Sequence, residues 1–520
     1  PECYTVVFVG RVRWVYESGM IIGRGYGQGS LFLLEQLIQL DVNSSDNLKV
    51  QIRKAIAVAI LDGHIALEQP IPSSRKLSQA LKVSRQTVTF AYEDLVEEGY
   101  LIARERRGYF VNEAILEGRV NTSIASHEVE SQVNWLSRLS CQPSQQRNIS
   151  KPANWQSYEY PFLSGQIDPA SFPLAEWREC SKQALSVLAV RDWTGDNMDA
   201  DDPQLIEQIR TRVLPRRGIW AQPEEILITV GTQHSLYLLS SLLSKSGACI
   251  AMEDPGYPDA RNIFQSHFDT VVAQPVDEQG LILDEKLESS DYVYVTPSHQ
   301  WPTSVTLPLE RRQQLLKMAD QSDLVILEDD YDIETNFIGE PSPALKSLDK
   351  SGRVIYMSSL SKVLAPGLRI GFMVAPAELI QEARALRRLM MRHPPMNNQR
   401  MTALFLARGH YDALLKRLWR VYKRNWEVMA EAIERNIPSH QQPTVGGGTS
   451  YWVKGPDNLD AELLRKAARA EGILLEVGEV AFAGPSGPRN YFRLGFTVIA
   501  EARIEKGVER IGQLITELCG

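Results

Sequence analysis

The stretch Tyr356-Met357-Ser358-Ser359-Leu360-Ser361-Lys362-Val363-Leu364-Ala365-Pro366-Gly367-Leu368-Arg369 is the most informative part of this 520-residue chain. Lys362 follows the hydroxyl residues Ser359 and Ser361 and precedes Arg369 by seven positions. A lysine amine can form an imine with an aldehyde, while hydroxyl and guanidinium groups bind a phosphate. The stretch therefore predicts a site for pyridoxal phosphate, with Lys362 as the imine-forming residue and the two serines and the arginine near the phosphate.

Four further residues or segments are consistent with the same cofactor. Asp329 ends an apolar run and is placed to pair with a pyridinium nitrogen, and Tyr331 projects the same way to the phenolic oxygen. Gly231-Thr232-Gln233 separates a strand from a helical run, so its amides are expected at a helix N-terminus, where phosphate binds. Tyr257 is an aromatic side chain suited to stacking on the ring. Each of these signals is common alone, and their order favours the site.

From residue 158 to residue 520, short apolar runs alternate with helical stretches. Fully apolar strands separated by helices are typical of a parallel sheet that is covered on both faces. The C-terminal part, with Gly446-Gly447-Gly448 and a strand over 490–496, is expected to form a smaller α/β lobe. The prediction is an α/β domain with a mostly parallel sheet, whose strands lie over 226–230, 248–252, 292–295, 324–327 and 354–356.

Residues 46–112 have a different pattern, with helical periodicity followed by two β-favouring pieces around a basic tip. The expected helices run from Leu48 to Asp62, follow the capping residues Ser73 and Ser74, and run from Ser84 to Glu98. The expected strands cover 100–103 and 109–111. Three helices and a two-stranded wing predict a winged helix-turn-helix.

The N-terminal residues of a recognition helix reach base edges in the major groove. We therefore expect the third helix to read DNA through Ser84, Arg85, Gln86 and Thr87, with Arg85 suited to guanine and Gln86 to adenine. The residues expected to contact phosphate or the minor groove are Arg75, Arg104, Arg106, Arg107 and Gly108. The alternative is a small helical docking domain whose arginines form a solvated face.

The distribution of charge favours the DNA-binding interpretation. The whole chain has a net charge of −8, whereas residues 48–112 hold ten Lys and Arg against seven Asp and Glu. A small basic module on a large acidic body suits a protein of which one part meets phosphate. Five scattered cysteines without metal-ligand spacing favour a reducing compartment and no metal site. Since no apolar run approaches the ~18 residues of a membrane span, we expect a cytoplasmic protein.

Two stretches have no predicted function of their own. Residues 1–45 are treated as an unassigned N-terminal extension. Residues 113–157 are polar and rich in Ser, Gln and Asn, which predicts a long interdomain linker. The two predicted domains are therefore 46–112 and 158–520.

These motifs resemble a known combination of domains. The segments 72–77, 83–88 and 108–111 resemble the winged helix of the GntR family. Thr296-Pro297-Ser298-His299-Gln300, Glu328-Asp329-Asp330-Tyr331-Asp332 and 364–369 resemble the MocR-type branch of the GntR regulators, which joins that winged helix to a fold-type I aminotransferase domain. The resemblance implies a DNA-binding transcriptional regulator that carries pyridoxal phosphate.

The resemblance also implies roles for residues and partners. Lys362 would form the imine, Asp329 would bind the ring nitrogen and Tyr331 the phenolic oxygen, while the phosphate ligands would be Thr232, Gln233, Ser359 and Arg369. Arg493 matches the arginine that holds the α-carboxylate of an amino-acid ligand; the alternative is a strand arginine that bridges the lobes. The implied partners are an operator in double-stranded DNA, an amine or amino-acid effector (or the cofactor itself), and a second copy in a domain-swapped, head-to-tail homodimer.

The chain departs from the family pattern at three positions, one of which is Ser304 in place of the glycine that ends the family's Pro-Thr-Gly turn. Arg107 stands where a small residue usually precedes the wing glycine, and Trp301 stands where aminotransferases commonly carry an Asn bonded to the phenolic oxygen. Trp301 favours a sensor that stops once the effector is bound. The rival hypotheses are an active aminotransferase with a DNA module, which turnover would reveal, and a scaffold that has lost the cofactor. The intact set of Lys362, Asp329, Tyr331 and Arg369 counts against the scaffold.

Overall fold

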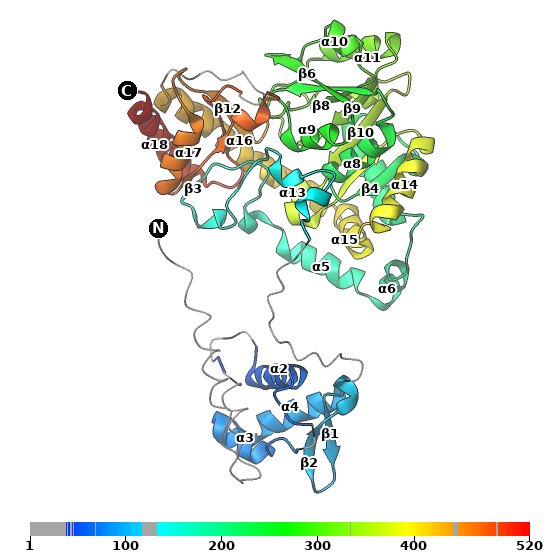
Figure 1. The fold of residues 1–520 in the computed structure, drawn as a ribbon, viewed down its shortest axis with the longest axis vertical. Coiled ribbons are helices and arrows are strands. Elements are labelled where there is room, and N and C mark those ends of the chain that lie inside the picture. Colours follow the sequence, from blue (N-terminus) through cyan, green and yellow to red (C-terminus); the bar gives the residue numbers. More distant parts are fainter. Residues whose placement is uncertain are drawn as a thin grey trace. The chain divides into compact units, whose positions relative to one another are not determined.

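The computed structural model describes residues 38, 40, 41, 44, 46–67, 69–116, 133–332, 334–438, 440, 446–484 and 487–520. The chain divides into two compact units, Pro1–Arg138 and Leu139–Gly520, whose elements are labelled in Figure 1. Most of the predicted extension 1–45 and residues 117–132 of the predicted linker lie outside the described residues.

The first unit contains the predicted winged helix. Its elements are α2 (Leu48–Leu61), α3 (Ser74–Leu81), α4 (Arg85–Glu97), β1 (Leu101–Arg104) and β2 (Gly108–Val111). Each helix follows a residue whose side chain accepts a backbone N–H three positions later; these capping residues are Asn47, Ser73 and Ser84. The two strands pair antiparallel, with Leu101 opposite Val111. The expected architecture of this unit is confirmed.

An apolar core joins the three helices to the wing. Leu77, Val88, Ala91, Leu95 and Leu101 are buried in it, and Leu81 is partly buried against it. Tyr92 lies in the same core, and its hydroxyl donates a 2.8 Å hydrogen bond to the Pro72 carbonyl. Its ring also meets the wing edge-on, 5.0 Å from the ring centroid of Tyr109. These contacts fix α4 relative to the wing and to the start of α3.

The second unit is built on an eight-stranded sheet of order β4-β11-β10-β9-β8-β5-β6-β7. All strands are parallel except β11 and the edge strand β7. The five predicted strands correspond to β4, β5, β8, β9 and β10. A mostly parallel sheet is therefore confirmed, with β4 (Ile226–Thr229), β5 (Cys249–Asp254), β6 (Thr270–Asp277), β7 (Gly280–Leu281), β8 (Tyr292–Val295), β9 (Val325–Asp329), β10 (Val354–Ser359) and β11 (Gly371–Val374).

Helices cover both faces of this sheet, which explains why its strands are apolar throughout. One face packs against α8 (Thr232–Leu243), α9 (Pro258–Gln265) and α14 (Ala377–Met391), which Figure 1 places around the strands. The other face packs against α11 (Leu309–Gln321) and α12 (Leu345–Leu348). The remaining helices outside the small lobe are α5 (Leu174–Ala184), α6 (Val187–Trp193), α7 (Pro203–Gln208), α10 (Glu285–Glu288), α13 (Ser361–Leu364) and α15 (Met396–Ala407).

The expected smaller lobe is present at the C-terminal end. Its antiparallel sheet has the order β12-β15-β14, and a second, two-stranded sheet pairs β13 with β3. Gly495 at the end of β15 lies so close to the 163–164 backbone that a Cβ there would be 2.2 Å from a Leu163 atom. The lobe comprises β3 (Tyr160–Pro161), β12 (Ser450–Lys454), β13 (Ile473–Leu474), β14 (Glu476–Val477), β15 (Tyr491–Gly495), α16 (His410–Asn436), α17 (Ala461–Ala470) and α18 (Glu501–Cys519).

Part of the stretch predicted as linker is attached to the second unit. Arg147 donates 2.7 Å hydrogen bonds from Nη2 to the carbonyls of Phe482 and Gly484, and Asn262 Nδ2 donates to the Arg147 carbonyl at 3.0 Å. Lys151 Nζ donates to the Ser164 carbonyl. We call residues 146–151 the strap, because they cross from one loop of this unit to another.

The described residues contain neither a helix that could span a membrane nor a cluster of side chains suited to a metal ion. None of the helices there combines the length and the apolar character needed to cross a membrane. The same residues contain no group of three or more His, Cys, Asp or Glu arranged to hold a metal ion.

Candidate functional site

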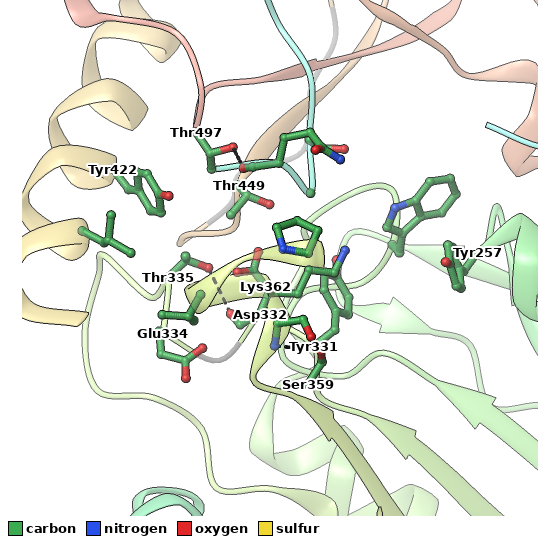
Figure 2. A pocket seen from close by; sticks show the side chains of 18 of the residues that line it. Tyr257, Tyr331, Asp332, Glu334, Thr335, Ser359, Lys362, Tyr422, Thr449 and Thr497 are labelled. Carbon is green, nitrogen blue, oxygen red and sulfur yellow. Dashed lines mark hydrogen bonds between the residues drawn. The ribbon is translucent and has the colours of Figure 1, made fainter. Parts of the chain in front are cut away.

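A cavity of about 310 Å³ opens at the carboxyl ends of the parallel strands, which is where ligands bind in sheets of this type. It is lined by most of the predicted cofactor residues, namely Gln233, Tyr257, Tyr331, Ser359, Ser361, Lys362 and Arg369. A narrower cavity of about 110 Å³ shares Lys362 and extends to Thr232 and Asp329. The fold thus brings all nine candidates to one place, and Figure 2 shows Lys362, Tyr331 and Ser359 beside one another.

Lys362 is presented by the turn from β10 into α13. Its side chain faces the open cavity, yet the protein surrounds it closely enough that loss of water lowers the pKa of its amine, and the positive charge of Lys151 lowers that pKa further. The amine lies 5.6 Å from the ring centroid of Tyr331. Gly165 leaves room for it, because a Cβ at that position would be 3.1 Å from Nζ. A lowered pKa favours the neutral, nucleophilic amine.

Asp329 lies at the end of β9 with one carboxylate oxygen satisfied and the other free. Tyr294 donates a 2.8 Å hydrogen bond to Oδ2. Oδ1 is buried without a hydrogen-bond partner among the described residues. Burial raises the pKa of Asp329 to about 7, although the bond from Tyr294 opposes the shift. A cationic N–H donor entering the narrow cavity would both satisfy this oxygen and favour its charge.

An anion-binding surface lies where β4 turns into α8. Gly231 caps the helix with φ 90°, and Arg369, itself at φ 51°, donates 2.8 Å from Nη2 to the Val230 carbonyl. A Cβ at position 231 would be 2.7 Å from Arg369 Nη2, so glycine is what allows the guanidinium to lie over the turn. The first amides of α8, at Thr232 and Gln233, have no acceptor within the helix. Together with Ser359, these groups suit a phosphate.

Gln233 and Tyr257 are held by a residue that sequence reasoning missed. Asp259 Oδ2 accepts 2.6 Å from Gln233 Nε2 and 2.8 Å from the Tyr257 hydroxyl. The Tyr257 ring lies edge-on to Trp301, with ring centroids 5.6 Å apart and an angle of 63°. The only local signal for Asp259 was its position two residues after Tyr257, which did not reveal that it bridges two candidate residues.

Ser361 lines the cavity, but its hydroxyl forms two hydrogen bonds with the backbone of Ile370. Ser361 Oγ donates to the Ile370 carbonyl at 3.1 Å and accepts from the Ile370 N–H at 2.7 Å. Ser359 Oγ accepts a weaker bond, 3.3 Å, from the Ser361 N–H. Between the two serines, Ser359 is therefore the one with more freedom to bind a ligand.

Arg493 reaches the cavity from β15 and is buried. Its Nη1 donates 2.8 Å to Ser164 Oγ and lies 3.5 Å from Glu476 Oε2. Its guanidinium carbon is 5.0 Å from the ring centroid of Trp301, and its Nε has no partner in the described part of the chain. Ser164, Glu476 and Lys151 surround this arginine, and no sequence motif pointed to them.

Two acidic side chains also line the cavity, which the sequence did not predict. Asp332 is buried, and its Oδ2 finds no partner within the described ranges. Glu334 accepts a 2.8 Å hydrogen bond from the Tyr411 hydroxyl, and burial raises the pKa of Glu334 to about 7. Figure 2 shows both acids on one side of Lys362, near Thr335. These groups offer hydrogen-bond acceptors to the far end of a ligand.

In the first unit, the predicted DNA-contacting residues lie on α3, at the start of α4 and on the wing, and all of them are exposed except the half-buried Thr87. Ser84 also caps the helix: its Oγ accepts from the Thr87 N–H at 3.0 Å and lies 2.8 Å from Thr87 Oγ1. Arg85 and Gln86 are exposed, and Arg85 Nε donates to Ser74 Oγ at 3.4 Å. On the wing, the Arg104 guanidinium lies 4.5 Å from the Phe110 ring centroid, and Gly108 has φ 100°.

Ion pairing separates the basic residues of this unit into two groups. Those on α2 are neutralised, since Lys49 pairs with Asp94, Arg53 with Glu98 and Lys54 with Asp46. No ion pair within the described residues involves the seven basic residues of α3, its C-cap, α4 and the wing, which are Arg75, Lys76, Lys82, Arg85, Arg104, Arg106 and Arg107. The uncompensated positive charge therefore lies on the elements that were predicted to meet DNA.

Comparison with known families agrees with both halves of this description. Residues 48–111 match the family described as bacterial regulatory proteins, gntR family, and residues 150–511 match aminotransferase class I and II. The chain belongs to the MocR-type branch of the GntR family. It is accordingly a transcriptional regulator with a DNA-binding winged helix and an aminotransferase-like domain.

Relatives of this MocR-type regulator cover nearly its whole length. It is 40% identical to the HTH-type transcriptional regulator TauR of Rhodobacter capsulatus, over 90% of this chain and 96% of that protein. It is 29% identical to the probable rhizopine catabolism regulatory protein MocR of Rhizobium meliloti, over 91% and 95%. Among solved structures it is similar to the kynurenine aminotransferase of Pyrococcus horikoshii, with a TM-score of 0.68, 26% identity and coverage of 74% and 99%.

The raised pKa of Asp329 predicts that the cofactor-free protein becomes less stable as the pH rises. Between an ordinary Asp pKa of 3.8 and the value of about 7, the folded state keeps a proton that the unfolded state has lost. The free energy of unfolding therefore falls by about 1.4 kcal/mol per pH unit across that window. The substitution Asp329→Asn removes this proton-binding contribution, so the stability of the variant relative to the original chain should increase by about 2 kcal/mol between about pH 5 and about pH 7.

Urea unfolding followed by tryptophan fluorescence measures this difference, because residues 48–111 contain no tryptophan and the signal comes mainly from the second unit. Equal differences between the variant and the original chain at both pH values would contradict the assigned burial of the Asp329 charge.

Proposed function

We propose that this MocR-type regulator binds pyridoxal phosphate on Lys362, and that the cofactor, or an amine or amino acid that reaches it, changes how the protein binds its operator. The observation that carries the proposal is the buried Asp329 Oδ1, which lines the same narrow cavity as Lys362 and lacks a partner among the described residues. A protonated pyridine nitrogen is the kind of donor that such an oxygen lacks. The proposal assigns the protein to the cytoplasm, where operator and effector meet.

The other lining residues suit the remaining parts of the cofactor. Burial raises the pKa of the Tyr331 phenol, so its hydroxyl stays protonated and can donate to the phenolic oxygen. The amides of Thr232 and Gln233, with Ser359 and Arg369, would hold the phosphate, and Tyr257 would lie against the ring. When bound, pyridoxal phosphate supplies an aldehyde that condenses with amines and a ring that withdraws electrons.

The effector would be bound by charged side chains of both signs that line the larger cavity. Arg493 offers a guanidinium fork whose Nε is unpaired within the described residues, and a carboxylate is the group that this fork binds best. The carboxyl groups of Asp332 and Glu334 would accept hydrogen bonds from a donor group elsewhere on the effector. An effector that favours one state of the protein needs only about 1 to 3 kcal/mol of coupling to change operator binding several-fold.

Transamination is the second candidate function. The lowered pKa of Lys362 favours it, because an enzyme of this kind uses the released lysine to move protons. Trp301 argues against fast turnover, since its indole takes the position of an amide donor to the cofactor. Product formation from an amino acid and a 2-oxo acid separates the two functions, because a sensor binds the amino acid and releases no product.

We expect Lys362→Ala to abolish the visible absorbance band of the cofactor imine, since Lys362 is the one lysine that lines the narrow cavity in the described part of the chain. The spectrum of the purified full chain with added pyridoxal phosphate, before and after borohydride, measures this loss. Lys317→Ala is the matched control, because Lys317 is exposed on α11 away from the cavity. A borohydride-sensitive band that survives in Lys362→Ala would refute the assignment of the imine to this lysine.

We expect Arg85→Ala to weaken binding to the preferred operator by about 1 to 3 kcal/mol and to relax the preference at one base pair. Arg106→Ala should instead weaken all duplexes similarly and reduce the salt slope by about one. Binding to duplexes selected from a random pool, titrated at several salt concentrations, measures both effects. Lys54→Ala is the control, because Lys54 pairs with Asp46, and an equally large loss there would argue against this DNA-binding face.

We also propose that the chain acts as a head-to-tail homodimer. Support comes from apolar side chains left exposed on the second unit at the start of α6 and the end of α14, namely Leu185, Val187, Leu188, Leu389 and Met390. Leu188→Asp should shift the purified chain toward monomer in analytical ultracentrifugation, whereas Leu463→Asp on the exposed side of α17 should not. A monomeric original chain at micromolar concentration would contradict the proposal.

A further inference from the structure

Lys151 belongs to a compact group of charges around Arg493. Its Nζ lies 3.2 Å from Glu476 Oε1 and donates to the Ser164 carbonyl. Ser164 completes the group, because its Oγ donates 2.8 Å to Glu476 Oε2 while accepting from Arg493. Glu476 and Arg493 are buried, and Lys151 and Arg493 both line the cavity that holds Lys362. One carboxylate thus links two cations beside the proposed ligand site.

The charges of this group do not balance. Burial alone would raise the pKa of Glu476, but Lys151, Arg493 and the bonds from Ser164 outweigh it and lower that pKa, so the carboxylate is ionised. Two cations and one anion leave a single positive charge in a partly dehydrated place. Arg493 Nε also lacks a partner among the residues described. Taken by itself, the group is therefore one monoanion short of neutrality, and both of its cations line the cavity.

Lys151 is also the last residue of the strap, whereas Arg493 is fixed in a strand. Arg147 anchors the other end of the strap to the carbonyls of Phe482 and Gly484. Before the strap, the chain leads through residues 139–145 toward the segment that connects to the winged helix. A change in what Lys151 binds therefore acts on the stretch of chain that joins the two units.

We infer that the Lys151 amine is a second contact for the anionic group of the effector. When the effector binds, this amine exchanges its contact with Glu476 for one with the effector, and the exchange alters the conformation of the strap. The inference rests on the proposed function, because it needs a ligand that is seated by the cofactor on Lys362. Lys151 would then both select amines that carry an anionic group and couple effector binding to the conformation of the strap.

Two small probes test the inference without knowledge of the natural effector. Aminooxyacetate and methoxyamine each exchange their aminooxy nitrogen for the Lys362 nitrogen on the cofactor carbon, which forms an oxime and releases the lysine amine without oxidation or reduction. Only aminooxyacetate carries a carboxylate. The measurements are the rate of oxime formation, read from the visible spectrum, and hydrogen exchange of the 139–157 amides in the full chain.

With the original chain, we expect faster reaction with aminooxyacetate than with methoxyamine, and altered exchange in the strap only with aminooxyacetate. Lys151→Met should lower the preference for aminooxyacetate by about tenfold, as expected for loss of a hydrogen bond to a charged group, and should remove the change in exchange. Lys151→Arg should keep the preference for aminooxyacetate and the change in hydrogen exchange, and Lys317→Met should behave as the original chain does.

The outcomes separate the inference from the function on which it rests. Absence of a cofactor band in the original chain would refute the proposed function. A band with equal reactivity toward the two probes, or a full preference retained in Lys151→Met, would overturn the role of Lys151 and leave the cofactor site standing. A preference that depends on Lys151 without any change in strap exchange would overturn the coupling.

Discussion

The parallel pairing of β9 with β10 is the constraint on which the site depends. The register places Asp329 opposite Met357, so the last residues of both strands reach the same edge of the sheet. The chain then continues from β10 through Ser359 to Lys362, which brings the amine into the same narrow cavity as the carboxylate. Parallel pairing of β8 and β5 adds the segments that follow them. An antiparallel arrangement would send alternate strand ends to opposite edges and disperse these groups.

Most of the fold was predictable because it depends on local patterns. Fully apolar runs identified the central strands, and capping residues such as Ser73 and Ser84 marked helix starts to within a residue. The candidate cofactor residues lie together as expected because most of them end or follow a strand that sheet geometry brings to one edge. Ser361 shows the limit of that reasoning, since its hydroxyl bonds to Ile370, a contact that depends on how the chain returns nine residues later.

The groups around Arg493 were not predictable for a related reason. Ser164 and Glu476 are 312 positions apart in sequence and meet only because β15 lies against the 163–164 backbone at Gly495. Lys151 lay in a stretch whose polar composition indicated a linker. The sequence indicated only that Trp301 stands where aminotransferases commonly carry an Asn. In the structure, its ring faces the guanidinium of Arg493. Such contacts arise from tertiary packing, and no local spacing encodes them.

Separate hydrophobic cores have an evolutionary consequence. The core of the winged helix is formed by residues between 38 and 115, and the cores of the aminotransferase-like unit are formed by residues after 148. Substitutions near the predicted DNA-contacting residues therefore leave the hydrophobic core of the second unit unchanged, and substitutions near the cavity leave the core of the winged helix unchanged. Under the proposed function, duplicated genes of this type can acquire new operators and new small-molecule ligands independently, so a shared target gene is weak grounds for assuming a shared ligand.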